Sequence, residues 1–220
     1  NAHPEKRIPL QKADQYGCEM LHALKFLHDW HRKIIFQDLK PDNVVVTFQG
    51  HCKLTDFGLA RADNHQGARE FTRIFVAPEI LTQSTYDERV DIFSWGATMM
   101  HLVLGGRHDY EGFQPQPVVL PVPADHFVRA MLPLLRRAPN QRQERELRDS
   151  GLSETIGAVP VSLLNALEQC LCVDPEDRPK IARLMNARDG GYYTEAYATE
   201  IETAGRQEDP TRNEMPYHYD

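Results

Sequence analysis

Basic residues are scarce in this chain relative to acidic ones. Its 220 residues include 25 Lys and Arg against 32 Asp and Glu, which gives a formal net charge of −7. A nucleic-acid footprint needs Lys and Arg clustered on one face. The one basic cluster, from Arg136 to Arg148, is interleaved with Glu144 and Glu146 and is typical of a solvated helix face. We therefore expect no nucleic-acid partner.

Long hydrophobic runs and cysteine motifs are also missing. The longest apolar stretch, residues 97–104, contains His101 and falls well short of a membrane span. No charged-then-apolar leader follows Asn1, so we expect no secretory signal. The four cysteines form no C-x-x-C pair, and the spacing of Cys170 and Cys172 is poor for a metal site. We expect reduced, packed cysteines in an intracellular, cytoplasmic protein.

Three short segments of the sequence carry the residues that suggest chemistry. The first runs from Phe36 to Asn43 and contains Asp38 and Lys40, the second is Asp56-Phe57-Gly58, and the third is Ala77-Pro78-Glu79. Together they offer a carboxylate to orient a hydroxyl, an ammonium for developing phosphate charge, and two oxygen ligands for a hard cation. These are the parts that Mg²⁺-assisted phosphoryl transfer requires.

The order and spacing of these segments resemble the protein kinase family. The signature of that family is H-R-D-L-x-x-x-N, then D-F-G, then A-P-E. The resemblance covers residues 11–188 and implies the large, C-terminal lobe of a kinase. Only 37 residues precede Asp38, and no G-x-G-x-x-G or V-A-I-K-like segment is present. We therefore expect a kinase fragment or a truncated gene product in which the small lobe is absent.

Hydrophobic periodicity predicts helices around one hairpin. Residues 11–30 have a helical period, and Asp91 to Leu104 is apolar on most sides, as in a buried helix. Val44–Val46 and Cys52–Leu54 are short runs connected through Gly50, which predicts a hairpin that ends at Asp56. Residues 58–76 show no period and are expected to form a flexible loop.

Later helices are predicted less regularly. Helical pieces are expected near 125–148, and one amphipathic helix from Ser162, a good N-cap, to Cys172. Another short helix follows Pro179. The predicted fold is α+β and mainly α-helical: a protein kinase-like large lobe over residues 1–188, with a short β-hairpin at the catalytic loop. Residues 189–220 show no core pattern and are expected to form a loosely ordered tail.

The resemblance implies a role for each matching residue. Asp38 corresponds to the catalytic Asp that orients the substrate hydroxyl, and Lys40 to the lysine of serine/threonine kinases that meets the transferring phosphate. Asn43 and Asp56 correspond to the Mg²⁺ ligands. Val45 would contact the adenine of ATP, and it would also suit a core strand.

Four more matches lie outside the catalytic loop. Glu79 resembles the acid that pairs with a distant Arg in the family, and Arg178 resembles that Arg. Asp91, in a segment like D-x-W-S-x-G, resembles the residue that anchors the catalytic loop. Thr72 matches a threonine near the substrate-binding loop; an ordinary loop threonine is the alternative.

The chain departs from the family pattern just before Asp38. Phe36 and Gln37 replace His-Arg. Phe36 can keep the packing of the histidine beneath Asp56-Phe57-Gly58 but cannot donate its hydrogen bond. Gln37 cannot pair with a phosphorylated activation-loop residue, so we hypothesise that any activity is not switched by phosphorylation through this position. Phe71 and Phe75 are unusual too and affect peptide docking, not phosphoryl transfer.

These residues suggest three function classes. The first is an ATP- and Mg²⁺-dependent serine/threonine protein kinase that acts on a protein hydroxyl. This chain would be its large lobe and is expected to be inactive alone. The second is a pseudokinase or interaction scaffold, which the Phe36-Gln37 change and the absent small lobe favour. The third, a hydrolase with Asp38 and Asp56 as paired carboxylates, leaves Lys40 and Asn43 without a role.

Overall fold

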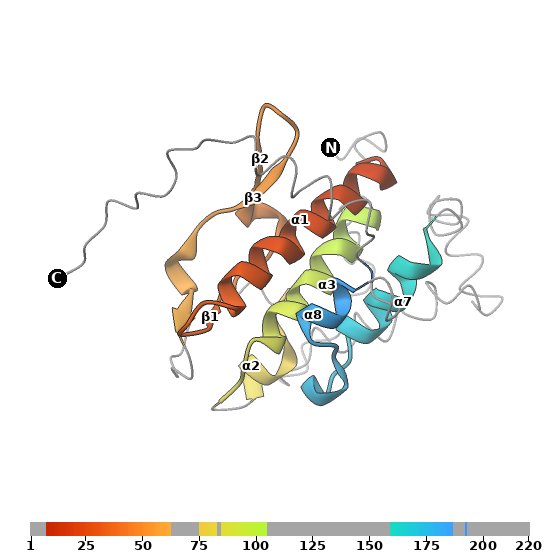
Figure 1. Cartoon of the computed structure of the whole chain (residues 1–220). Coiled ribbons are helices and arrows are strands. Elements are labelled where there is room, and N and C mark those ends of the chain that lie inside the picture. Colours follow the sequence, from red (N-terminus) through yellow and green to blue (C-terminus); the bar gives the residue numbers. More distant parts are fainter. Residues whose placement is uncertain (1–7, 63–74, 83–84, 105–158, 187–191, 193–220) are drawn as a thin grey trace, which may run out of the picture.

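Two helices that lie side by side form the centre of the fold (Figure 1). The computed structural model describes residues 8–62, 75–82, 85–104, 159–186 and 192. Helix α1 spans Leu10–His28 and buries one face, which includes Leu21 and Leu24. Helix α3 spans Arg89–Leu104, and every residue from Val90 to Met100 is buried. Both predicted helices are confirmed, with ends that differ by one or two residues.

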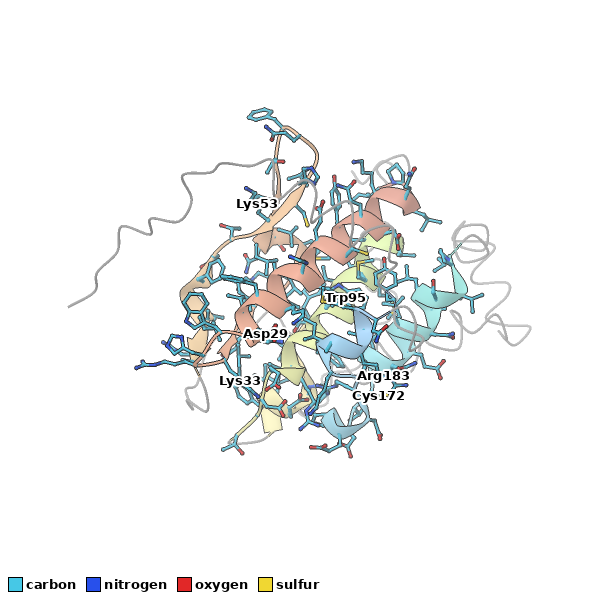
Figure 2. All side chains as sticks on the ribbon, viewed as in Figure 1. Asp29, Lys33, Lys53, Trp95, Cys172 and Arg183 are labelled. Atoms are coloured by element: carbon cyan, nitrogen blue, oxygen red, sulfur yellow. The ribbon has the colours of Figure 1, made fainter. Side chains whose placement is uncertain are left out.

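A glycine allows α1 and α3 to approach closely. The indole Nε1 of Trp95 donates a hydrogen bond to the carbonyl oxygen of Gly17 at 2.9 Å. A Cβ atom at position 17 would lie 2.7 Å from Cε and Sδ of Met99. Figure 2 shows Trp95 among the helices, whereas Lys53 lies at the edge of the molecule. The contact between α1 and α3 therefore depends on a residue without a side chain.

The C-terminal helices complete the core around α3. Helix α7 spans Val161–Cys170 and packs on α3, and the short α8, Ile181–Leu184, contacts α1. A 3₁₀ turn, Pro175–Asp177, lies between α7 and α8. The prediction of Ser162 as N-cap was wrong: Pro160 occupies that position, and no side chain caps the helix. The ψ of 141° at Pro160 supplies the extended backbone that precedes a helix, so the helix begins there without a side-chain cap from Ser162.

Two small antiparallel sheets lie on the other side of α1 (Figure 1). Strand β2, Val44–Val46, pairs with β3, Cys52–Leu54, with Val44 opposite Leu54. Strand β1, Ile34–Ile35, pairs with β4, Arg61–Ala62. The prediction of an irregular loop from residue 58 onward was wrong at β4, because a two-residue strand leaves no periodic signal. Residues 63–74 lie outside the described part.

Three shorter elements flank these strands. The 3₁₀ turns Pro41–Asn43 and Phe57–Leu59 precede β2 and follow β3, and helix α2 spans Pro78–Thr82. The helical pieces predicted near 125–148 and the tail predicted from 189 lie outside the described residues, except for Tyr192. In the part of the chain that the structure describes, no helix combines the length and hydrophobicity needed to span a membrane.

The cysteines are thiols that belong to the packing of the core. All four are free, and Cys18, Cys52 and Cys170 are buried. Burial raises the pKa of each of these three thiols well above its ordinary value. Such thiols are poor nucleophiles at neutral pH, so these cysteines act as small hydrophobic residues.

Candidate active site

The loop that carries Asp38 is fixed by a buried carboxylate on α3. The backbone N–H groups of Phe36 and Gln37 donate to the two oxygens of Asp91, each at 2.7 Å, and Nε2 of His28 lies 2.9 Å from Oδ2. Asp91 is fully buried. Gln37 has a φ of 68°, a conformation that residues with a side chain rarely adopt. We attribute its retention to the two bonds that hold the consecutive amides on one carboxylate.

Asp38, Lys40 and Asn43 contact one another directly. The Nζ atom of Lys40 lies 3.0 and 2.9 Å from the two carboxylate oxygens of Asp38. The Nδ2 atom of Asn43 donates to the Asp38 carbonyl oxygen at 2.8 Å and to its Oδ2 at 2.7 Å. The turn Pro41–Asn43 brings these side chains together, since Pro41 fixes φ at its start. One carboxylate, one ammonium and one amide therefore form a single partly buried cluster.

Asp56 lies at the other end of the hairpin. It has a left-handed backbone, with φ 59° and ψ 78°, and its side chain accepts a hydrogen bond from the N–H of Gly58 at 3.2 Å. The left-handed residue of this turn is Asp56 itself and not Gly58. Gly58 instead permits close approach, since a Cβ there would lie 3.1 Å from Oδ1 of Asp56.

The two ends of the hairpin are joined by backbone. The N–H of Thr55 donates to the carbonyl oxygen of Asn43 at 3.0 Å, next to the pairing of Val44 with Leu54. This bond places the segments that carry Asn43 and Asp56 beside each other. Val45 is 48% exposed, so its interpretation as a buried core residue was wrong.

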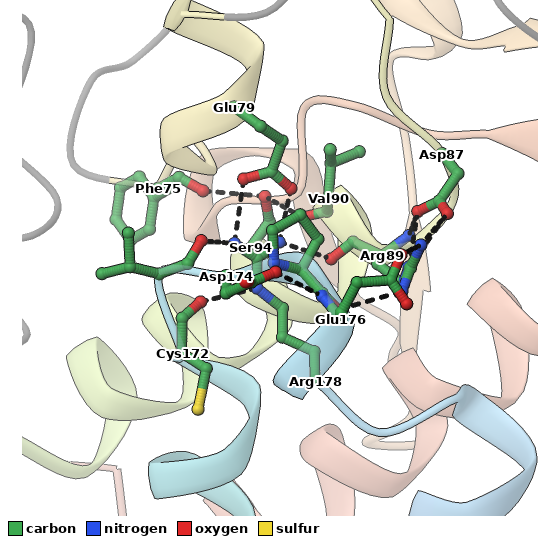
Figure 3. A network of polar contacts seen from close by, with 12 residues as sticks. Phe75, Glu79, Asp87, Arg89, Val90, Ser94, Cys172, Asp174, Glu176 and Arg178 are labelled. Carbon is green, nitrogen blue, oxygen red and sulfur yellow. Dashed lines mark hydrogen bonds and ion pairs between the residues drawn. The ribbon is translucent and has the colours of Figure 1, made fainter.

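A buried ion pair connects α2 to the turn after α7 (Figure 3). Arg178 reaches Glu79 through two bonds, Nη1 to Oε1 at 2.5 Å and Nη2 to Oε2 at 2.9 Å. It also donates to the carbonyl oxygens of Cys172, Val173 and Arg89. The guanidinium carbon lies 5.0 Å from the centre of the Phe93 ring. Every direction in which this cation can bond is therefore occupied by protein.

Comparison with known proteins decides the family. The family model described as "Protein kinase domain" matches residues 2–188. The chain belongs to the protein kinase family.

Several named kinases are similar to this chain. It is 36% identical over 104 residues to "Protein kinase C eta type" from Homo sapiens, a match that covers 46% of this chain and 15% of that protein. It is 40% identical over 95 residues to "Protein kinase C-like 1" from Caenorhabditis elegans, covering 41% and 13%. With "Serine/threonine-protein kinase STE20" from Saccharomyces cerevisiae it shares 27% over 190 residues, covering 84% and 17%. The matched regions thus span 13–17% of the length of these relatives.

Phe36 and Gln37, which depart from the kinase pattern before Asp38, are both packed in the core. Phe36 is fully buried and packs edge-to-face on Phe57, with ring centroids 5.2 Å apart, so the prediction that it keeps the packing is confirmed. Gln37 is also buried, and its Oε1 accepts a hydrogen bond from the hydroxyl of Tyr86 at 3.3 Å. Burial, aided by the charge of Asp91, raises the pKa of Tyr86. Tyr86 therefore remains a donor to Gln37 at neutral pH.

A second arginine was not predicted from the sequence. Arg89 binds Asp87 through Nε, 3.0 and 2.9 Å from its two oxygens, and its Nη2 lies 2.6 Å from Oε1 of Glu176 (Figure 3). Burial alone would raise the pKa of Asp87, but the hydrogen bonds and charge of Arg89 lower it overall. The bond to Arg89 also lowers the pKa of Glu176. Opposite charges two residues apart, at positions 87 and 89, were the only signal in the sequence for this ion pair.

Other predicted and missed residues complete the site. Thr72 and Phe71 lie outside the described residues, so the role of Thr72 stays a prediction. His28 and Glu19 were missed, although both are polar residues of α1 with little exposure. A titratable residue next to the apolar face of a predicted helix is the signal that could have identified them.

Proposed function

We propose that residues 1–188 form the large lobe of an intracellular serine/threonine protein kinase that transfers the γ-phosphate of Mg-ATP to a protein hydroxyl. The observation that carries this proposal is the direct contact of Asp38 with Lys40 and Asn43, in a loop fixed by Asp91. Family membership supports a kinase function in general terms. The serine/threonine class is favoured by Lys40 and by the name of the yeast relative.

Each side chain of the site has a chemical part in this proposal. Asp38 accepts a hydrogen bond from the substrate hydroxyl and orients its oxygen toward the γ-phosphate. Lys40, now on the carboxylate of Asp38, is close enough to offset charge that develops on the transferred phosphoryl group. The transition state of this reaction is loose, so positioning and charge matter more than the strength of the base.

The residues fit a bound Mg²⁺. Asn43 uses its nitrogen to bond Asp38, which leaves its amide oxygen as the atom suited to a hard cation. Asp56 offers an exposed carboxylate that the N–H of Gly58 orients. When bound, the metal would neutralise phosphate charge. Val45, half exposed on β2, would contact the adenine.

The chain of 220 residues is proposed to have little or no activity by itself. Its sequence contains no glycine-rich phosphate loop and no strand lysine of the small-lobe type. These parts hold the nucleotide from the other side in kinases. Phosphoryl transfer by this chain alone, at a rate equal to that of the full-length gene product, would refute the proposal.

A pseudokinase scaffold is the second candidate. The replacement of His-Arg favours it, because Phe36 cannot donate the hydrogen bond of the histidine and Gln37, bonded to Tyr86, carries no charge that could pair with a phosphate. Such a scaffold would bind partner proteins through its surface and would not depend on the metal ligands.

Mg²⁺-dependent binding of ATP tests the two candidates against each other. We expect the full-length gene product to bind ATP more tightly with Mg²⁺ than with EDTA, and Asp56→Asn to abolish that difference. Asp29→Asn, which alters an exposed ion pair at the C-terminal end of α1, is the control and should behave like the unchanged protein. Absence of Mg²⁺-dependent affinity in the unchanged, folded protein would favour the scaffold. Mg²⁺-dependent affinity that survives Asp56→Asn would contradict the role of Asp56 as a metal ligand.

A further inference from the structure

One carboxylate on α1 holds the hairpin that carries the proposed metal ligands. Glu19 accepts hydrogen bonds at both oxygens: from the N–H of Cys52 to Oε2 at 2.6 Å, and to Oε1 from Nδ1 of His51 at 2.7 Å and Nε2 of Gln15 at 2.9 Å. The side chain of Glu19 is only 9% exposed. Gln15 extends the contact, since its Nε2 also lies 3.0 Å from the carbonyl oxygen of Gly50.

Apolar burial of the hairpin is only partial: Val44 and Leu54 are partly buried and pack against the core. Val45 and Val46 are about half exposed, and Phe48 at the turn is fully exposed. Among the residues of β2 and β3, Cys52 alone is buried. Its thiol bonds the carbonyl oxygen of Tyr16 at 3.5 Å, again on α1. Because this apolar packing is partial and not directional, the polar bonds centred on Glu19 fix the position at which the hairpin lies on α1.

The position of Cys52 is transmitted to both ends of the hairpin. Asp56 follows Cys52 by four residues, and a strand is a stiff connection that rises about 3.3 Å per residue. The pairing of Val44 with Leu54 and the bond from Thr55 to Asn43 carry the same displacement to Asn43. A shift of the hairpin along α1 would therefore move Asp56, whereas Asp38 is held separately by the bonds of Asp91 to its loop.

We propose that Glu19 is a positioning residue, which fixes the β2–β3 hairpin on α1 and thereby sets where Asp56 presents its carboxylate to Mg²⁺. This inference rests on the proposed function, because it assigns to Asp56 the role of a metal ligand. Glu19 itself bonds to Gln15, His51 and Cys52. In this proposal it acts on the reaction through the position of the metal ligands.

The test is calorimetric binding of ATP to the full-length gene product, with Mg²⁺ and with EDTA. Glu19→Gln keeps the length of the side chain but leaves one acceptor oxygen for three donors. We expect it to weaken Mg²⁺-dependent binding about tenfold, as for the loss of one charge-assisted hydrogen bond, with binding in EDTA unchanged. In the Asp56→Asn background, which is expected to abolish Mg²⁺-dependent binding, Glu19→Gln should have no further effect.

Two further variants keep the outcome clear. Asp29→Asn, at the exposed residue that follows the same helix, should leave both affinities unchanged. If Glu19→Gln does not fold, His51→Ala removes one of the three donors at a partly exposed side chain, and we expect about a threefold loss that again requires Mg²⁺.

Three results would overturn the inference. Glu19→Gln could bind Mg-ATP as tightly as the unchanged protein does. It could instead lose ATP affinity equally in Mg²⁺ and in EDTA, a result that would indicate a general structural role. It could also add its full effect to that of Asp56→Asn. If the unchanged protein shows no Mg²⁺-dependent affinity at all, the proposed function fails first, and this inference fails with it.

Discussion

Removing the charge of Glu79 should destabilise the fold more than any exposed substitution. The side chains of Arg178 and Glu79 are 0% and 2% exposed, so water cannot replace either partner. Glu79→Gln keeps the shape but leaves the guanidinium with three carbonyl oxygens and no counterion. Breaking a buried pair from one side costs about 3–5 kcal/mol. For a chain of this size that corresponds to a fall in Tm of roughly 6–20 °C.

Urea unfolding of the chain, monitored by the fluorescence of the buried Trp95, measures this loss in the free energy of unfolding. The control is Asp29→Asn, which breaks the Lys25–Asp29 pair, whose side chains are 38% and 61% exposed. An exposed pair of this kind contributes about 0–1 kcal/mol. The contrast between the two variants isolates the effect of burial.

The partner substitution sharpens the same prediction. Arg178→Met leaves the carboxylate of Glu79 buried and also removes the donor to three carbonyl groups, so it should cost at least as much as Glu79→Gln. The double variant contains no buried charge at this site and should cost less than the two single variants added together. The reasoning would be refuted if Glu79→Gln cost no more than Asp29→Asn, or if the two single effects were strictly additive.

Three other substitutions test separate parts of the structure. Gly17→Ala places a Cβ 2.7 Å from Met99 and should lower the free energy of unfolding by about 1–3 kcal/mol; an unchanged urea midpoint would contradict the close packing of α1 on α3. Asp91→Asn leaves one acceptor oxygen for the N–H groups of Phe36 and Gln37, so stability should fall by about 1–3 kcal/mol, and phosphoryl transfer should fall more than ATP binding does. Arg89→Met should destabilise the chain at neutral pH. Arg89 lowers the pKa values of Asp87 and Glu176, so the stabilisation it provides is complete above their ordinary pKa values of 3.8 and 4.5 and is lost as the pH falls through the lowered pKa values. A difference in the free energy of unfolding between the two proteins that stayed constant down to pH 2 would contradict this.

The elements with a strong apolar period could be predicted from the sequence. Helices α1 and α3 lie where their periodicity indicates, because each buries a continuous stripe or its whole surface. Strand β4 was missed, since two residues that pair with β1 from 26 and 28 positions away leave no local pattern. The cap of α7 was misassigned to Ser162, because proline and serine both suit a helix start and only the backbone decides between them.

The site shows the same division between local and distant information. The cluster of Asp38, Lys40 and Asn43 is contained in six residues, so the motif predicted its members correctly as neighbours. Glu19, His28 and Arg89 act across 33, 63 and 87 positions, and single polar residues at such separations have no signature in one sequence. Asp56 adopts a left-handed backbone although a glycine lies two residues later, and its side chain accepts a hydrogen bond from the N–H of that glycine; neither feature has a signal in the sequence.

The most direct test of the central claim is transfer of the γ-phosphate of Mg-ATP by the full-length gene product to serine- or threonine-containing protein acceptors, measured beside Asp38→Asn. Asp38→Asn keeps the size of the side chain and removes the carboxylate that would orient the hydroxyl, so transfer should fall by at least about 10²-fold. Asp29→Asn should retain the full rate. Absence of transfer in the unchanged, folded protein, or equal transfer in Asp38→Asn, would contradict the assignment of this cluster as a catalytic site.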